Sequence, residues 1–103
     1  SEQLCTVFAG RRKLLLDGLA GIDGIVCSQP EGAFYVFPCI KSTGMKSSEF
    51  CEKLIYSKKV AVVPGSAFGE SGEGYVRVSY AYSVQHITTA LQRIKEFVEE
   101  LKK

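Results

Sequence analysis

Three stretches of the chain repeat apolar residues at the spacing of an α-helix. In residues 3–19 the apolar positions recur three, four and seven apart, and residues 47–58 show a shorter version of the same pattern. Ser47 or Ser48 can cap this second helix, and Ser83 can cap the third. The third helix has the most regular apolar positions: Val84, Ile87, Leu91, Ile94, Val98 and Leu101. We therefore expect three amphipathic helices.

Shorter apolar runs predict β-strands at residues 24–27, 33–37, 60–63 and 75–81. The runs AFYVF and VAVV are apolar without alternation, which is typical of strands buried on both faces. The run YVRVSYA alternates instead, so that Val76, Val78 and Tyr80 share one face and Arg77 points to the other. Residues 29–32 (QPEG) are expected to form a turn.

The order of these elements is helix, strand, strand, helix, strand, strand, helix. It predicts an α+β fold with a small, mostly antiparallel or mixed sheet and helices packed on one face. The length of 103 residues fits one domain, residues 1–103. Three helices can cover one face of such a sheet well and the other only in part. We therefore expect something else to lie against the second face.

The composition argues against two large classes of protein. Hydrophobic residues make up 46% and charged residues 23%, a globular balance that argues against disorder. No apolar run approaches the roughly 20 residues of a membrane-spanning helix, and the first residues do not resemble a signal peptide. The net charge of +2 favours neither nucleic acid nor a membrane as a partner. Because the only methionine is Met45, we expect the sequence to be a piece of a longer chain.

The cysteines, Cys5, Cys27, Cys39 and Cys51, form no C-x-x-C pair, and His86 is the only histidine. Their spacing therefore predicts no zinc site. Two disulfides are arithmetically possible. Because each cysteine has apolar neighbours, we interpret them instead as reduced thiols of a cytoplasmic protein.

Residues 65–74 (GSAFGESGEG) are rich in glycine and follow a strand, which invites comparison with a phosphate-binding loop. The glycine spacing fits neither G-x-G-x-x-G nor G-x-x-x-x-G-K-[ST], and Glu70 and Glu73 would repel a phosphate. We therefore expect a flexible connection between two strands.

Arg77 is the only charged residue of its strand and faces the side of the sheet with less cover. A guanidinium there can donate two parallel hydrogen bonds to a carboxylate ligand. The alternative is an ion pair with a glutamate on a neighbouring strand, and the spacing leaves both open. His86, in the first turn of the last helix, and the basic residues 11–13 fit solvated surface positions better than catalysis or nucleic-acid binding.

Four segments occur together in one order: RRKLLLDGL, PEGAFYVFP, VAVVPGSAFGESGEGYVRVSYA and SVQHITTALQRIKEFV. This order resembles the C-terminal small domain of class I/II pyridoxal-phosphate aminotransferases, in the aspartate aminotransferase superfamily of fold type I. The resemblance covers about residues 7–101. The motifs P-[EQ]-G-A-F-Y and V-P-G-x-x-F-G…[IV]-R-[ILV]-S-Y-A are specific together, although each is weak alone.

The resemblance implies roles for two residues. In that family the arginine of the R-x-S-Y-A strand binds the α-carboxylate of the substrate, and it corresponds to Arg77. The aromatic residue after G-A lies near the substrate, which makes Phe34 a weaker candidate. The resemblance also implies the cofactor pyridoxal 5′-phosphate, a large cofactor domain that closes over the substrate with the small one, and a homodimeric parent.

The sequence departs from the family where the cofactor chemistry resides. The family's catalytic lysine lies in a pattern like S-K-x-x-x-x-x-G-x-R-x-G, of which Ser57-Lys58 matches only the beginning. We therefore reject Lys58 as the catalytic lysine and expect substrate-binding residues but no catalytic residue in this chain.

The resemblance implies the small domain of a cytoplasmic aminotransferase, which transfers an amino group between an amino acid and a 2-oxo acid. As an isolated fragment, this domain would be inactive. The alternatives are a stand-alone regulatory or carboxylate-binding module, which would also use Arg77, and a pure interaction domain.

Overall fold

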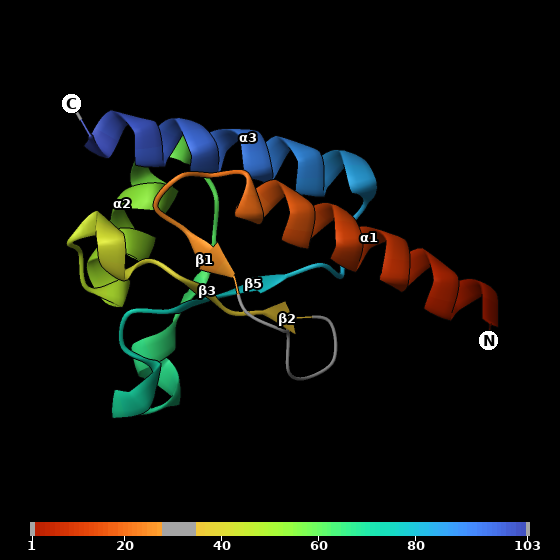
Figure 1. Ribbon diagram of the computed structural model, residues 1–103, viewed down its shortest axis with the longest axis horizontal. Helices are drawn as coiled ribbons and strands as arrows, with labels where there is room; N and C mark the ends of the chain where they lie inside the picture. The colour runs from red at the N-terminus through yellow and green to blue at the C-terminus, as the bar shows by residue number, and fades with distance from the viewer. Residues whose placement is uncertain (1, 28–34, 103) are drawn as a thin grey trace.

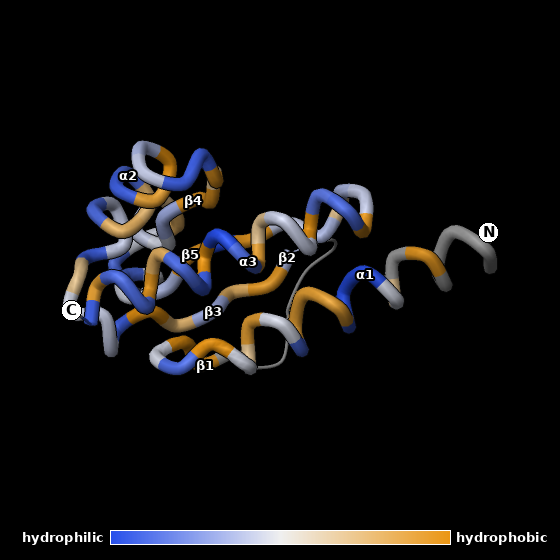
Figure 2. The backbone as a smooth tube through the Cα atoms, turned by 90° about the horizontal axis from the view of Figure 1, so that it is seen from above, coloured by the Kyte–Doolittle hydropathy of each residue, from blue (hydrophilic) through white to orange (hydrophobic). Residues whose placement is uncertain are grey.

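The computed structural model describes residues 2–27 and 35–102. Its helices are α1 (Glu2–Ala20), α2 (Ser47–Lys58) and α3 (Val84–Leu101). All three predicted helices are confirmed, α2 with the predicted ends. In Figure 1, α1 and α3 lie on one side of the strands and α2 packs at one end. Figure 2 shows the same molecule from above, with α1 and α3 side by side.

The described strands are short: β1 (Val26–Cys27), β2 (Tyr35–Val36), β3 (Pro38–Cys39), β4 (Val63–Pro64) and β5 (Val76–Ser79). β1 pairs with β3, and a three-stranded sheet has the order β2-β5-β4, with antiparallel pairs throughout. Of the predicted strand at 60–63 only Val63 pairs in β4. The turn predicted at 29–32 lies outside the described residues. The α+β class with a small antiparallel sheet is confirmed.

The core lies between the sheet and the helices, and the predicted stripe of α3 supplies much of it. Ile87, Ile94 and Val98 are buried as expected, whereas Val84, in the first turn, is 55% exposed. Phe97 is buried too, although it is not one of the apolar positions predicted from the three- and four-residue spacing. Its ring packs edge-on against that of Phe50 in α2, with centroids 5.2 Å apart. The buried stripe of α3 is therefore wider than the sequence pattern indicated.

The loop at 65–74 is built from two 3₁₀ turns, η2 (Gly65–Phe68) and η3 (Glu70–Gly72). Its ends are joined by a hydrogen bond of 2.8 Å from the Gly65 N–H to the Tyr75 carbonyl. The segment connects β4 to β5, as predicted, and local hydrogen bonds and close backbone packing give it a folded rather than an irregular course. In Figure 1 these turns lie on the far side of the strands from α1 and α3.

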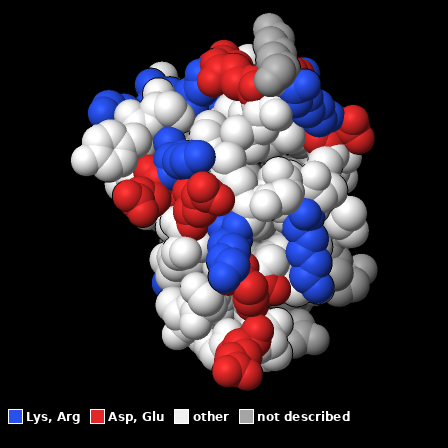
Figure 3. Space-filling model, turned by 90° about the vertical axis from the view of Figure 1, so that its left-hand side faces the viewer, with Lys and Arg blue, Asp and Glu red and all other residues white. Residues whose placement is uncertain are grey.

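Other expectations concern charge and sulfur. Acidic and basic side chains are interleaved on the face drawn in Figure 3.

The Cys39 and Cys51 thiols are free, and burial raises the pKa of the Cys51 thiol to about 11. Within residues 2–27 and 35–102, His, Cys, Asp and Glu form no group of three or more that could hold a metal ion. No helix in the same ranges is long and apolar enough to cross a membrane.

Candidate functional site

The alternation of β5 places Arg77 on the opposite face of the sheet from the core. Val76 and Val78 are buried, and Arg77 between them is half-buried. This orientation confirms the prediction made from the strand pattern. It follows from the two-residue repeat of a β-strand, since both flanking valines face the helices.

Two aromatic rings surround the guanidinium of Arg77. Its Cζ lies 4.2 Å from the centre of the Tyr35 ring and 4.9 Å from the centre of the Phe68 ring. Tyr35 comes from the neighbouring strand β2, and Phe68 comes from the turn η2. Contacts of this kind attract the cation to the ring faces without requiring a hydrogen bond to its N–H groups. The rings therefore restrict the guanidinium and leave its donors for another group.

No carboxylate in the described ranges pairs with Arg77. None of the ion pairs formed there includes it, and its register partner on β4 is Val63. The alternative interpretation, an ion pair with a glutamate on a neighbouring strand, is therefore wrong for this part of the chain. A half-buried guanidinium that no carboxylate of the described residues neutralises is suited to bind an anionic ligand.

A pocket of about 730 Å³ opens between residues 59–63, β5 and the first half of α3. Tyr35 and Arg77 belong to its lining, together with Lys59 and Arg93. No acidic side chain of the described residues lines it. The lining is therefore positively charged overall, and its volume lies in the range of small-molecule sites, about 300–1,000 Å³.

The two other cations of the pocket make hydrogen bonds to backbone groups. The Lys59 Nζ donates to the Tyr56 carbonyl at 3.2 Å, and an Arg93 guanidinium N–H donates to the Lys58 carbonyl at 3.2 Å. These bonds satisfy donors but do not neutralise the charges. An anionic ligand in this pocket would thus meet basic side chains that no acidic side chain of the described lining neutralises.

Lys58 is not among the residues that line the pocket. Its Nζ lies 2.6 Å from a Glu100 carboxylate oxygen and 3.9 Å from one of Glu96, and the side chain is 17% exposed. The lysine joins the end of α2 to the end of α3. In this structure, Lys58 therefore links two helix ends through ion pairs.

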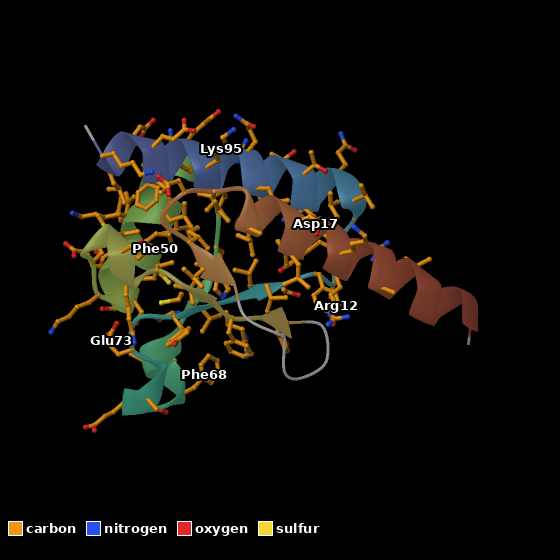
Figure 4. All side chains as sticks on the ribbon, viewed as in Figure 1. Arg12, Asp17, Phe50, Phe68, Glu73 and Lys95 are labelled. Atoms are coloured by element: carbon orange, nitrogen blue, oxygen red, sulfur yellow. The ribbon has the colours of Figure 1, made fainter. Side chains whose placement is uncertain are left out.

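The remaining sequence candidates lie elsewhere. Phe34 falls outside the described residues. His86 is exposed, as predicted, and its ring stacks on that of Tyr82 with centroids 4.5 Å apart. The basic residues 11–13 are less solvated than predicted, because Arg11 and Arg12 are half-buried (Arg12 is labelled in Figure 4).

Sequence reasoning missed Tyr35 and Phe68. Both belong to the aromatic motifs of the chain, GAFYVF and GSAFG, of which the family resemblance assigns a role only to Phe34. Tyr35 could have been found by aligning the two strands as antiparallel neighbours. Nothing in the local sequence indicates that the Phe68 loop folds back to β5.

The known proteins that this chain resembles in sequence include several aminotransferases. The model of the family "Aminotransferase class I and II" matches residues 2–94. The chain is 45% identical to an aspartate aminotransferase of Pyrococcus horikoshii over 98 residues, 95% of this chain and 25% of that protein. It is also 45% identical to aromatic-amino-acid aminotransferase 2 of Thermococcus litoralis over 101 residues, 98% of this chain and 26% of that protein.

Solved structures agree with the sequence matches. The crystal structure of an aromatic aminotransferase from Pyrococcus horikoshii superposes with a TM-score of 0.93 at 42% identity, covering 98% of this chain and 27% of that one. An alanine aminotransferase from Pyrococcus furiosus gives a TM-score of 0.90 at 31% identity, covering 96% and 25%. The chain spans about a quarter of the length of the relatives it matches. Sequence motifs, fold and relatives thus lead to one assignment: this chain belongs to the aminotransferase class I and II family.

Proposed function

We propose that this chain is the C-terminal small domain of a cytoplasmic, pyridoxal-phosphate-dependent aminotransferase and supplies its substrate-carboxylate site. The parent enzyme transfers an amino group between an amino acid and a 2-oxo acid. Family membership supports the reaction class, and the aminotransferases among the relatives are about four times as long as the matched segment. The parent forms a homodimer mainly through its large domain, which lies outside this chain.

The observation that carries the proposal is the guanidinium of Arg77, held between two rings with no carboxylate partner in the described ranges. Amino acids and 2-oxo acids share an α-carboxylate. One planar fork can therefore bind both substrates of the reaction through two parallel hydrogen bonds. In a site closed by a second domain, the low dielectric would strengthen that pair beyond its value in water.

The role of this chain is to bind the carboxylate of the substrate and so to orient the substrate. By fixing the carboxylate, Arg77 limits the rotation of the substrate and sets the direction in which its α-carbon faces the rest of the site. Tyr35 and Phe68 hold the guanidinium and shield it from water. Phe34, two residues before Val36, is proposed from the motif alone to lie near the same substrate.

We propose that this chain does not itself hold the pyridoxal phosphate. Lys58 is engaged by Glu100 and Glu96, and the Lys59 ammonium donates to a carbonyl of its own chain. The cofactor would be held by the large domain of the parent. The isolated fragment is accordingly proposed to be inactive.

Replacing Arg77 by lysine in the full-length parent tests the proposal. Lysine keeps the charge but loses the planar fork, so the substrate carboxylate is left poorly paired. We expect kcat/KM to fall tens- to several-hundred-fold for amino acid and 2-oxo acid alike, about 2–4 kcal/mol. The melting temperature should stay nearly unchanged, because Arg77 serves a ligand rather than the core.

The matched control is Arg12→Lys, which changes a half-buried arginine of α1 outside the pocket and should leave kcat/KM near normal. An Arg77→Lys enzyme with normal kcat/KM and a melting temperature many degrees lower would assign Arg77 to structure instead.

A further inference from the structure

The carboxylate of Glu73 binds the first backbone N–H of α2 from a distant part of the chain. One of its oxygens, Oε2, accepts hydrogen bonds of 2.7 Å from the Ser47 N–H and 2.7 Å from the Gly74 N–H. Ser47 begins α2, and the residue at the cap position, Lys46, provides no side-chain cap. Glu73 therefore takes the role of a helix cap from 26 residues further along the chain.

A second contact joins the same helix end to the other side of the loop. The Ser66 N–H lies 3.4 Å from the Ser47 hydroxyl oxygen, and Ser47 is fully buried. Ser66 belongs to the turn η2, which also carries Phe68. The start of α2 thus holds the loop 65–74 near both of its ends.

Phe68 depends on this attachment more than a core residue would. Its side chain is 52% exposed, so burial alone does not fix its place. The ring contacts Phe37 edge-on, with centroids 6.3 Å apart, and covers Arg77. Figure 4 shows Phe68 and Glu73 in the same part of the molecule, on the far side of the strands from α3.

We infer that Glu73 is a positioning residue for the carboxylate site: by fastening the loop 65–74 to the start of α2, it holds Phe68 over the guanidinium of Arg77. This inference rests on the proposed function of Arg77. The negative charge of Glu73 also suits its place, because the amino end of a helix attracts an anion. Glu73 acts through Phe68 and does not itself touch the substrate.

A double-mutant cycle in the full-length, cofactor-loaded parent tests this inference. Glu73→Gln keeps the shape of the side chain but removes its charge, and Phe68→Leu removes the ring over Arg77. We expect each single change to raise KM for both the amino acid and the 2-oxo acid about three- to tenfold, with kcat within about twofold. Because both changes act through one contact, the double variant should bind no worse than Phe68→Leu alone.

The matched control is Glu49→Gln, which neutralises another carboxylate in the first turn of α2 whose partner is the exposed Lys53. It should leave KM unchanged. Melting curves of all variants show whether helix stability alone is affected.

Two results would overturn the inference. In one, Glu73→Gln lowers the melting temperature while KM stays normal, which makes Glu73 a helix cap only. In the other, the two effects on KM multiply, which shows that Glu73 does not act through Phe68. If the Arg77→Lys enzyme keeps its activity, the proposed function itself fails. If that enzyme is impaired but the effects of Glu73→Gln and Phe68→Leu on KM multiply, only the role of Glu73 fails.

Discussion

At Gly65 and Gly72 the two backbones approach so closely that neither residue has room for a side chain. A Cβ on Gly65 would lie 2.0 Å from the Gly72 carbonyl oxygen, and one on Gly72 would lie 2.1 Å from the Gly65 oxygen. The obstacle in each case is backbone, which cannot rotate aside as a side chain can. These two glycines therefore close the loop that carries Phe68.

Gly65→Ala should destabilise the protein by about 1–3 kcal/mol, because the added methyl group forces the two backbones apart. Gly10→Ala on α1 is the control, because a Cβ added there would meet no other group within 4 Å. That change should be neutral or stabilise the helix by up to about 1 kcal/mol. Urea unfolding of the three proteins measures both effects, and equal stability of Gly65→Ala and the wild type would contradict the close approach.

At the scale of elements, the helices begin in two different ways. α3 has the predicted cap, with the Ser83 hydroxyl oxygen accepting a 3.1 Å hydrogen bond from the His86 N–H. α2 does not, because neither serine at its start is the cap residue and Glu73 serves that end instead. A local cap can be predicted from neighbouring residues, whereas a cap supplied by a distant loop cannot.

Ser83→Ala should cost about 1 kcal/mol of stability, since it leaves an N–H in the first turn of α3 without its acceptor. Ser48→Ala, an exposed change in the first turn of α2, should alter stability by less than about 0.5 kcal/mol. Thermal unfolding followed by circular dichroism compares the two. A Ser48→Ala protein as unstable as Ser83→Ala would mean that α2 has the local cap its sequence suggested.

At the scale of the whole molecule, Glu73 connects the loop on one side of the sheet to the helix at its end. The hydrogen bond from the Ser47 N–H, followed by that from the Gly74 N–H, holds the pKa of the Glu73 carboxyl below its ordinary value, against the opposing effect of burial. The folded state therefore favours the ionised carboxylate.

Because the folded pKa is lowered, the stability that Glu73 contributes is fully present above its unfolded pKa and is lost as pH falls through the folded pKa. The stability difference between wild type and Glu73→Gln should accordingly be largest near neutral pH and shrink below about pH 4.5. Denaturant unfolding at neutral and acidic pH measures this difference. A difference that stays constant with pH would show that the charge of Glu73 does not matter.

The helices, the α+β class and the direction of Arg77 could all be predicted from the sequence. These features follow from periodicity, because a repeat of 3.6 or 2 residues decides which side chains can share a face. The quoted motifs also led to the correct family. Short-range chemistry decided the cap of α3 in the same way.

The surroundings of Arg77, and the contacts that hold them in place, could not be predicted from the sequence. Tyr35 reaches it from the next strand, Phe68 from a folded loop, and Glu73 fastens that loop to α2. A glycine-rich run does not show from its sequence alone that its glycines allow two backbones to pack closely. Contacts between residues far apart in the chain depend on how the elements pack, and no local pattern of residues specifies that packing.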